Sequence, residues 1–248
     1  FNLIAMIAGF PSWANDGHPP RVQLDDPKRT TLRSAWRQAG TQSAKDMHNE
    51  GGRPFSFPGR VPGYGYVFPD IDRINPRYFQ YMDRKIDYLN SQGFLAFIEV
   101  ARRDLSQALK KYHAWPDSYA RYIQYVWSRY QANNCILSPI HYDSGHLSIP
   151  GREYNVAANA VFDKGVPAFG SLCSCNSAGS SLINFGGAQE ARWLGLHQIG
   201  NLRDHNSHWL LTEIYREADP PRPALNGEPY YAGWPPGTSV PPDSPEAV

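Results

Sequence analysis

The sequence predicts an α/β protein, a (β/α)8 barrel whose first and last strands are missing from this chain. Three observations favour this class. Short apolar runs follow segments with helical spacing, and this unit repeats along the chain. Glycines stand between helix and strand in two of the units, as they commonly do at helix ends. The length of 248 residues suits one such barrel.

The first strand is predicted at Phe1–Ile7, an apolar run at the start of the sequence. The segment Gly9–Asp70 follows and is dense in Gly, Pro and polar residues. A segment this long without periodicity is typical of an elaborate functional loop, so we expect it to lie over the active-site face. Its aromatic residues, among them Trp13 and Tyr64, favour an ordered loop whose rings stack on substrate.

The next unit begins at a clear capping signal. Asn75 followed by Pro76 is typical of a helix start, and Gly93 is typical of a helix end. The apolar run Phe94–Val100 follows at once and predicts a strand. Asp117 is expected to cap the helix after it.

The same alternation continues to the end of the chain. Helices are predicted at 117–130, 154–162 and 207–217, and strands at 135–140, 167–172, 195–200 and 224–226. The total is six strands, two fewer than a closed barrel requires. We therefore expect the missing strands to lie outside this chain, to come from a second chain, or to be absent from an open sheet. Residues 1–248 are interpreted as a single barrel domain with a Pro-rich end at 232–248.

Composition argues against several classes of partner. The net charge is +1, and Lys and Arg are scattered, so no electrostatic field favours nucleic acid. No apolar stretch approaches the roughly 20 residues that span a bilayer. The sequence shows no signal peptide. The aromatic content of 13% fits both a large core and a sugar-binding cleft lined with rings.

The three cysteines do not form a disulfide framework. Cys173 and Cys175 are too close in sequence for an easy bridge, and Cys135 lies inside an apolar run. Buried thiols are therefore the expected state. A zinc site is a weaker alternative, because no second Cys/His pair stands at finger spacing.

Two carboxylates stand just past the ends of predicted strands. Asp143 closes the run 137–143, and Glu228 closes the run 223–229. The C-terminal ends of barrel strands face the active site, so the two side chains are expected to converge there. A pair of carboxyl groups at one barrel mouth is the minimum equipment for cleaving a glycosidic bond.

Residues 74–83 contain Asn-Pro-x-Tyr-Phe with a following Asp, and residues 223–230 read Pro-Ala-Leu-Asn-Gly-Glu-Pro-Tyr. These two segments resemble a helix phrase and the phrase Pro-x-Leu-Asn-Gly-Glu-Pro-x-Tyr of the apiosidase-like glycoside hydrolases. Residues 1–4 resemble the family's second strand, and residues 121–130 resemble the helix before its fourth strand. The chain departs from the family in two places. Relatives often have a Trp and paired glycines where this chain has residues 138–142, and they often have a His where it has residues 173–176.

This resemblance implies a (β/α)8 barrel that cleaves glycosidic bonds with retention, in a branched polysaccharide or oligosaccharide such as those of plant or algal cell walls. It implies an acid/base carboxylate after strand four and a nucleophile after strand seven. If Phe1 begins strand two, these residues are Asp143 and Glu228. The resemblance also implies a secreted, periplasmic or cell-surface location. We expect a carbohydrate substrate and no cofactor.

Further residues near the strand ends are candidates for substrate binding. They are Glu99, His141, Tyr142, His197, Asn226, Tyr230 and Trp234. Glu99 would orient the sugar or be the true acid/base, and a buried partner of Arg102 or Arg103 is an equally good interpretation. His141 and His197 would hydrogen-bond a sugar hydroxyl or a carboxylate, and a structural role fits either of them at least as well.

Two other functions fit the same residues. The first is a carbohydrate-binding or structural barrel that has lost catalysis, which the departures around Asp143 favour. The second is a metal-dependent barrel hydrolase that uses His141, Asp143, His197 and Glu228.

Overall fold

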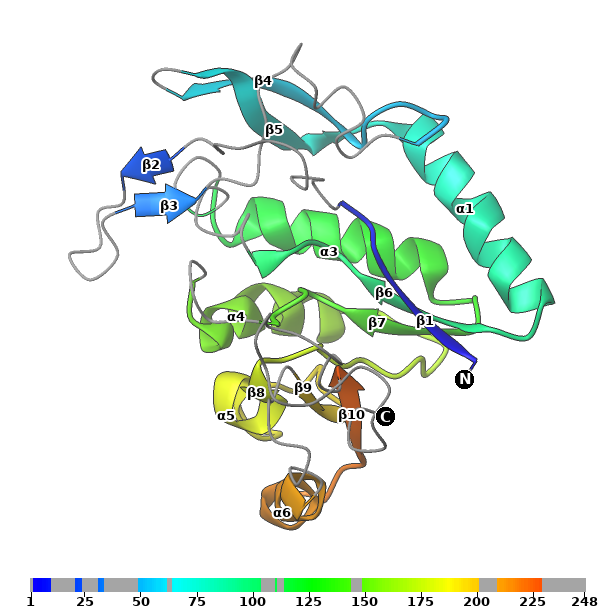
Figure 1. The fold of residues 1–248 in the computed structure, drawn as a ribbon, viewed down its shortest axis with the longest axis vertical. Coiled ribbons are helices and arrows are strands. Elements are labelled where there is room, and N and C mark those ends of the chain that lie inside the picture. The colour runs from blue at the N-terminus through cyan, green and yellow to red at the C-terminus, as the bar shows by residue number, and fades with distance from the viewer. Residues whose placement is uncertain are drawn as a thin grey trace, which may run out of the picture.

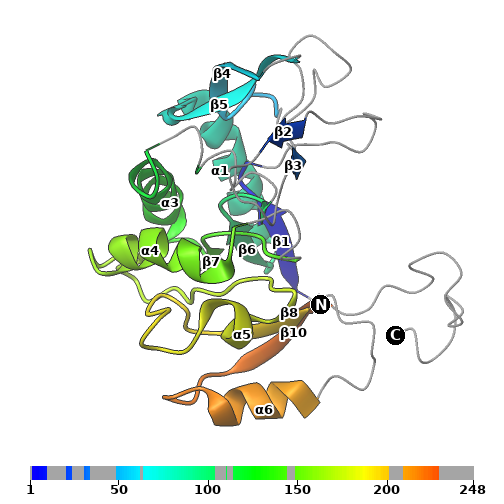
Figure 2. The same cartoon turned by 90° about the vertical axis from the view of Figure 1, so that its left-hand side faces the viewer.

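A computed structural model describes residues 2–9, 21–23, 31–33, 49–61, 64–103, 110, 114–143, 149–200 and 209–228. Within these residues the chain is an α/β protein with parallel β/α units (Figure 1). The antiparallel hairpin β4–β5 lies at one end of the molecule and helix α6 at the other, as Figure 2 also shows.

The parallel strands follow each other in chain order. Strands β1 (Leu3–Ile7), β6 (Leu95–Glu99) and β7 (Cys135–Ser138) pair in that order, and β9 (His197–Gly200) pairs with β10 (Ala224–Glu228). An extended segment, residues 172–177, connects the two groups through parallel bridges at Cys173 and Ser174. Each strand therefore lies beside its successor, which is the order of a barrel and not of a doubly wound sheet.

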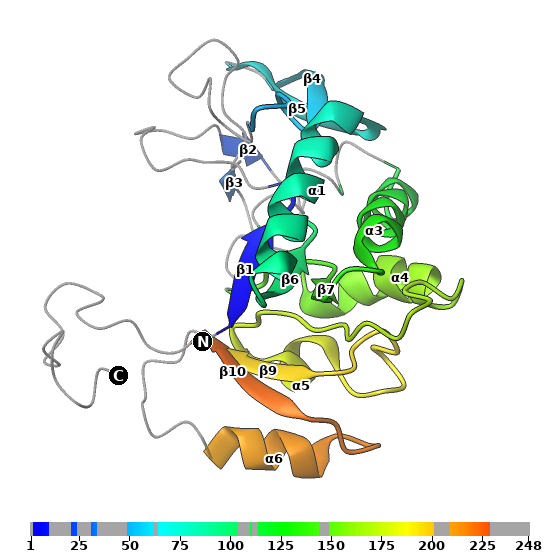
Figure 3. The ribbon, with the colours of Figure 1, turned by 90° about the vertical axis from the view of Figure 1, so that its right-hand side faces the viewer.

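Helices connect these strands and cover one face of the sheet. They are α1 (Pro76–Ser91), α3 (Asp117–Tyr130), α4 (Gly151–Phe162), α5 (Ser181–Phe185) and α6 (Trp209–Glu217). Figure 3 shows α1, α3 and α4 on the same side of β1, β6 and β7. Between α4 and β9, the two-residue strand β8 (Gly179–Ser180) pairs antiparallel with β9.

The segment expected as one long loop, 9–70, contains two antiparallel hairpins in its described parts. Strand β2 (Arg21–Gln23) pairs with β3 (Thr31–Arg33), and β4 (Phe55–Val61) pairs with β5 (Tyr64–Ile74). The ring of Phe55 packs edge-on against Tyr122 of α3, with 5.0 Å between centroids. The base of the second hairpin is thereby part of the core.

The predicted start and end of α1 are confirmed. The Asn75 side chain accepts a hydrogen bond from the Arg77 amide at 3.1 Å, and Pro76 is the first helical residue. Gly93 follows the helix with a φ of 81°, which a side chain would disfavour.

Two expectations about other elements are wrong. Asp117 does not cap α3, because the helix begins at Asp117 itself and Pro116 precedes it without a side-chain cap bond. Residues 167–172 do not form the fifth strand. They contain a turn with Gly170 at a φ of 72°, and pairing with β7 starts only where the Leu137 amide bonds to the Leu172 carbonyl.

The sheet has an apolar cluster on each face. The larger cluster joins helix residues such as Phe79, Trp127 and Tyr154 to Ile98 and Leu137 of the strands. On the other face, Phe97, Ile136 and Leu196 form a small buried cluster against which Leu95 and Leu225 pack. Successive residues of a strand point to opposite faces, so this second cluster marks the face that would line a barrel interior.

Candidate functional site

A layer of polar side chains follows the small apolar cluster toward the C-terminal ends of the strands. Three of these residues come two positions after a residue of the cluster, and the fourth has the equivalent position in segment 172–177. Their side chains therefore point to the same face of the sheet as the cluster. The members are Glu99, Ser138, Ser174 and Gln198, all of which are buried. Gln198 Nε2 donates to Ser174 Oγ at 2.8 Å, and Ser174 Oγ donates to the Leu196 carbonyl at 2.6 Å. The interior of the sheet thus changes from apolar to polar toward the strand ends.

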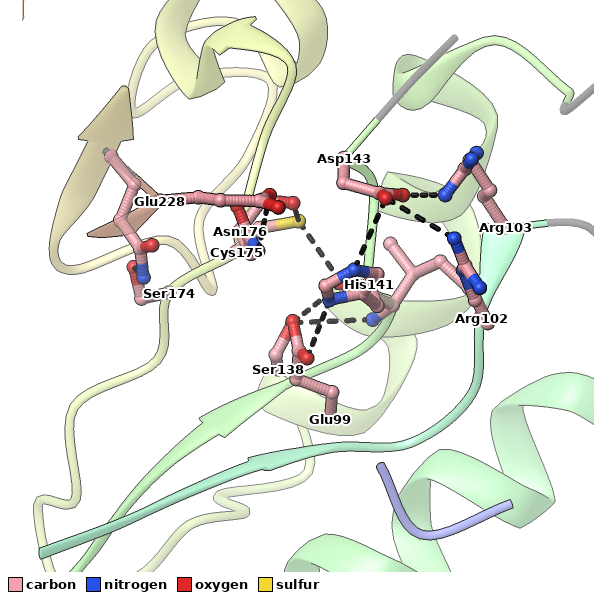
Figure 4. A network of polar contacts seen from close by, with 12 residues as sticks. Glu99, Arg102, Arg103, Ser138, His141, Asp143, Ser174, Cys175, Asn176 and Glu228 are labelled. Carbon is pink, nitrogen blue, oxygen red and sulfur yellow. Dashed lines mark hydrogen bonds and ion pairs between the residues drawn. The ribbon is translucent and has the colours of Figure 1, made fainter. Parts of the chain in front are cut away.

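His141 and Asp143 continue this layer past the end of β7. His141 Nδ1 lies 2.6 Å from Glu99 Oε2, and His141 Nε2 lies 3.5 Å from Asp143 Oδ2 (Figure 4). Tyr142, between them, points to the opposite side and packs edge-on against Tyr154 and Phe185. Ile140 also belongs to the helix-side cluster, so the alternation shifts by one residue after Ser138, and His141 and Asp143 lie together on the interior side.

Two arginines contact Asp143. Arg102 Nη2 lies 3.3 Å from Asp143 Oδ2, and Arg103 forms a second ion pair with Asp143 Oδ1. The side chains of all three residues are largely buried, with exposed fractions of 16%, 14% and 12%. Because both guanidinium groups are positive, they favour the ionised form of the Asp143 carboxyl group. Glu99 hydrogen-bonds to His141, and the charge of Arg102 acts on it as well, so its interpretation as a buried partner of Arg102 or Arg103 stays a prediction.

Glu99 is in surroundings that favour its protonated form. Its side chain is 1% exposed, and burial raises the pKa of this carboxyl group well above its usual range. The negative charge of Glu228 raises the pKa further, while Arg102 and the backbone amide of Asn176 lower it. A buried carboxyl group of this kind can hold a proton near neutral pH.

Glu228 reaches the site from the end of β10. Asn176 Nδ2 donates to Glu228 Oε2 at 3.0 Å, and the Asn176 carbonyl accepts from the Tyr142 amide at 2.8 Å. Asn176 therefore links the ends of β7 and β10 and orients the Glu228 carboxylate (Figure 4). Sequence reasoning did not select Asn176. The available signal was its place at the departure from the family pattern, in the run 173–176.

A β-bulge turns Glu228 toward the interior. Asn226 pairs with Ile199 and Glu228 pairs with Gly200, so Gly227 is an extra residue in β10. In a regular strand Glu228 would share a face with Asn226. A Cβ on Gly227 would lie 1.9 Å from Gln198 Oε1, so Gly227 also faces the interior and leaves no room for a side chain.

We expect Gly227→Ala to lower both stability and any activity of this site. The added methyl group must displace Gln198, which breaks its bond to Ser174, and must shift the neighbouring Glu228. Overpacking of this kind costs about 1–3 kcal/mol, which urea unfolding would measure. Gly187→Ala is the matched control, because a Cβ there meets nothing within 4 Å. Equal effects of the two substitutions would contradict the close approach at Gly227.

The structure brings three predicted residues together. One ring nitrogen of His141 and one carboxylate oxygen each of Asp143 and Glu228 all lie within 4.8 Å of one another. These atoms could in principle surround a cation, but the guanidinium groups of Arg102 and Arg103 already supply positive charge beside Asp143. The chemistry that fits this charge arrangement is proton transfer beside a second carboxylate.

Other predicted residues lie away from this group. Tyr142 is in the helix-side core, and its hydroxyl donates to the Ile149 carbonyl at 3.3 Å. His197 is fully buried, with Nδ1 3.0 Å from Ser181 Oγ of α5, and its neighbour Gln198 faces the interior instead. Asn226 alternates with the interior residue Leu225 and so faces the helices. Tyr230, Trp234 and Trp13, and the side chain of Tyr64, are outside the described part of the chain.

His197 makes stability depend on pH. Burial lowers the pKa of its ring from the usual 6.5 to about 4, with a smaller contribution from Arg222. The unfolded chain therefore binds a proton that the folded chain resists, and this part of the stability is lost as the pH falls from 6.5 toward 4.

We expect His197→Gln to flatten the dependence of the unfolding free energy on pH in that window, by at most about 3 kcal/mol. Urea unfolding at several pH values between 4 and 7 measures this slope. Gln92→Ala, which removes an exposed amide from the end of α1, should keep the wild-type slope. A variant curve parallel to the wild-type curve would contradict the assignment.

The three cysteines are buried free thiols, as the sequence predicts. Among the helices in the described ranges, none combines the length and the apolar character needed to cross a membrane.

Residues 34–246 match the family model described as "Apiosidase-like, catalytic domain". A solved "putative glycoside hydrolase" from Bacteroides vulgatus is similar in structure, with a TM-score of 0.56 and 17% identity. The match covers 93% of this chain and 39% of that one, so this chain spans well under half of that protein's length. A glycoside hydrolase family 5 structure from the same species gives a TM-score of 0.48 at 17% identity, over 62% of this chain and 35% of the other. No curated protein matches the chain. At such identities the structural likeness concerns the fold.

Proposed function

Because this chain belongs to the family of apiosidase-like catalytic domains, we propose that it is a retaining glycoside hydrolase with Glu228 as the nucleophile and Asp143 as the acid/base. The observation that supports this proposal most directly is the distance between the two carboxylates, whose nearest oxygens lie within 4.8 Å. Retaining enzymes hold their carboxyl groups about 5–5.5 Å apart, and inverting enzymes about 6.5–9.5 Å apart. This separation supports retention, because an inverting mechanism needs room for a water molecule between sugar and base.

In the first step, Glu228 attacks the anomeric carbon and the bond to the leaving oxygen breaks. Asp143 gives its proton to that oxygen, so the leaving group departs as an alcohol. In the second step, Asp143 takes a proton from water, and the resulting hydroxide displaces Glu228 from the anomeric carbon. The sugar is released with its original configuration, and both carboxyl groups return to their starting states.

The surroundings of Glu228 suit a nucleophile. The bond from Asn176 Nδ2 fixes Oε2, and the bulge at Gly227 keeps the carboxylate aimed into the interior. A nucleophile held in one orientation loses little entropy when it attacks, which is a major source of rate enhancement.

The substrate class and location of the protein are part of the same proposal. The family description fits a branched polysaccharide or an oligosaccharide derived from it, such as those of plant or algal cell walls. An enzyme acting on such material would work outside the cytoplasm, as a secreted, periplasmic or cell-surface protein. A complete (β/α)8 barrel would need two strands in addition to the six parallel segments described here.

Proton NMR of the first sugar released tests the proposal. Aryl glycosides of several pentoses and hexoses, including an aryl apioside, are incubated with the wild-type protein, and the anomeric signal is recorded before mutarotation. We expect the configuration of the substrate to be retained. Inversion would exclude the roles given to the two carboxylates. Binding of an oligosaccharide without turnover of any probe would instead favour a carbohydrate-binding barrel without catalysis.

A further inference from the structure

We infer that Glu99 and His141 form a proton relay that supplies the proton of Asp143 from the interior side of the site. This inference rests on the proposed function, since it concerns how the acid/base residue is loaded. Glu99 and His141 are positioning residues in this scheme, because they act on the sugar only through Asp143.

The His141 ring contacts Glu99 through one nitrogen and Asp143 through the other, so the three side chains form a continuous chain of contacts. Glu99 Oε2 and His141 Nδ1 are 2.6 Å apart, a short hydrogen bond between a buried carboxyl group and a ring nitrogen. The other ring nitrogen, Nε2, lies 3.5 Å from Asp143 Oδ2. A carboxylate on one ring nitrogen sets the proton that the other ring nitrogen carries. His141 therefore presents an N–H group to Asp143 whenever the ring is charged.

The relay explains how Asp143 can be protonated although two arginines contact it. Arg102 and Arg103 both pair with Asp143 and favour its ionised form, whereas the first step of hydrolysis needs the protonated form. An acid stabilised as its conjugate base requires a nearby proton source. Glu99 and His141 supply one without solvent access, since Glu99 is 1% exposed.

The charge balance of the site favours an extra proton on the pair. In the described part of the chain, the charged or titratable groups facing the pair are Arg102, Arg103, Asp143, Cys175 and Glu228. The two arginines balance Asp143 and Glu228, so the site is neutral when Glu99 and His141 together carry no net charge. Burial and the charge of Glu228 raise the pKa of Glu99, so the pair holds its extra proton in the hydrogen bond between Glu99 Oε2 and His141 Nδ1, and the ring still presents an N–H group at Nε2.

The proton transfers balance over one turnover. The charged His141 ring gives its Nε2 proton to the Asp143 carboxylate, and Asp143 passes it to the leaving oxygen. The ring is then neutral, with its Nδ1 proton held by Glu99. In the second step Asp143 removes a proton from water, and that proton returns through Nε2 to the His141 ring.

Histidine NMR on the 15N-labelled full chain tests the pair without any substrate. The His141 signal is identified by its absence in His141→Gln. We expect the His141 ring in the wild type to lose its charge at a higher pH than a free histidine, and Glu99→Gln to lower that midpoint by about one unit or more. The amide of Gln keeps an acceptor for Nδ1 but has no charge. An unchanged midpoint in Glu99→Gln would overturn the relay.

Kinetics on two aryl glycosides of one sugar test its role. The probes are a phenyl glycoside, which needs acid assistance, and a 2,4-dinitrophenyl glycoside, which needs little. We expect His141→Gln to lower kcat on the phenyl glycoside by roughly 10²-fold and to affect the dinitrophenyl glycoside much less. We expect Glu99→Gln to move the alkaline limb of the kcat/KM profile to lower pH. Equal losses on both probes with an unshifted limb would show a merely structural role and overturn the relay.

His197→Gln is the matched control, because it makes the same substitution at a buried histidine that faces α5. The alkaline limb of the kcat/KM profile of this variant should coincide with that of the wild type. If the wild type turns over no glycoside, the proposed function fails, while the NMR midpoints still decide whether Glu99 governs His141. The two failures are therefore distinguishable.

Discussion

Glu228→Gln should abolish turnover while leaving the fold intact. The Gln side chain still accepts the hydrogen bond from Asn176, so the thermal unfolding midpoint should stay near that of the wild type. The amide cannot attack the anomeric carbon, and removal of a nucleophile lowers kcat by roughly 10⁴–10⁶-fold. Initial rates on the best aryl glycoside of the wild type measure this loss. Glu217→Gln, an exposed substitution in α6, is the matched control and should keep full activity.

Azide gives the assignment of Glu228 a second readout. In Glu228→Ala the shortened side chain leaves space for azide, which attacks the sugar directly and yields a glycosyl azide of inverted configuration. Recovery of a glycosyl azide with retained configuration would contradict the nucleophile role, because it would mean that a covalent intermediate still forms without Glu228.

Asp143→Asn should have the second largest effect, and this effect should depend on the leaving group. General acid catalysis contributes typically 10²–10⁴-fold, so we expect a loss of about that size on a phenyl glycoside. With a 2,4-dinitrophenyl glycoside the first step needs no acid, so the intermediate forms and accumulates as a burst. Stopped-flow absorbance measures both phases.

The Asn variant also leaves Arg102 and Arg103 without their carboxylate partner, which lowers stability. Its unfolding free energy must therefore be measured beside the rates. In Asp143→Ala, azide should react with the covalent intermediate and give a glycosyl azide of retained configuration. The opposite configurations expected for the Asp143 and Glu228 variants separate the two roles in one assay. The same configuration from both would contradict the pairing of roles.

Local signals in the sequence were sufficient for much of the architecture. Asn75, Pro76 and Gly93 define α1 through bonds and dihedral angles within a few residues, and the structure confirms them. The predicted strand at 167–172 is wrong because pairing with β7 depends on partners far along the chain. An apolar run alone does not show where pairing begins. Asp117 failed as a cap because the helix begins one residue earlier than the capping pattern requires.

The site was predictable in outline and not in detail. Asp143 follows β7 and Glu228 follows β10, and segment 172–177 bridges the two sheets that hold these strands, so their approach follows from the order of the parallel segments. The face of the sheet to which the His197 side chain points was not predictable, because it depends on the register of β9 against β10. The arginines at Asp143 and the amide of Asn176 come from other strand ends, and no spacing in the sequence relates them to the carboxylates.

The extra residue in β10 has a consequence for comparing relatives of this protein. Deleting Gly227 would remove the bulge, and the glutamate would then follow Asn226 directly, keep its pairing with Gly200 and still face the interior. The glutamate would instead turn toward the helices in a regular strand of unchanged length, in which Gly227 pairs with Gly200. A homologue one position shorter in this strand should therefore keep its glutamate in the site, and a gap at Gly227 does not by itself indicate loss of catalysis.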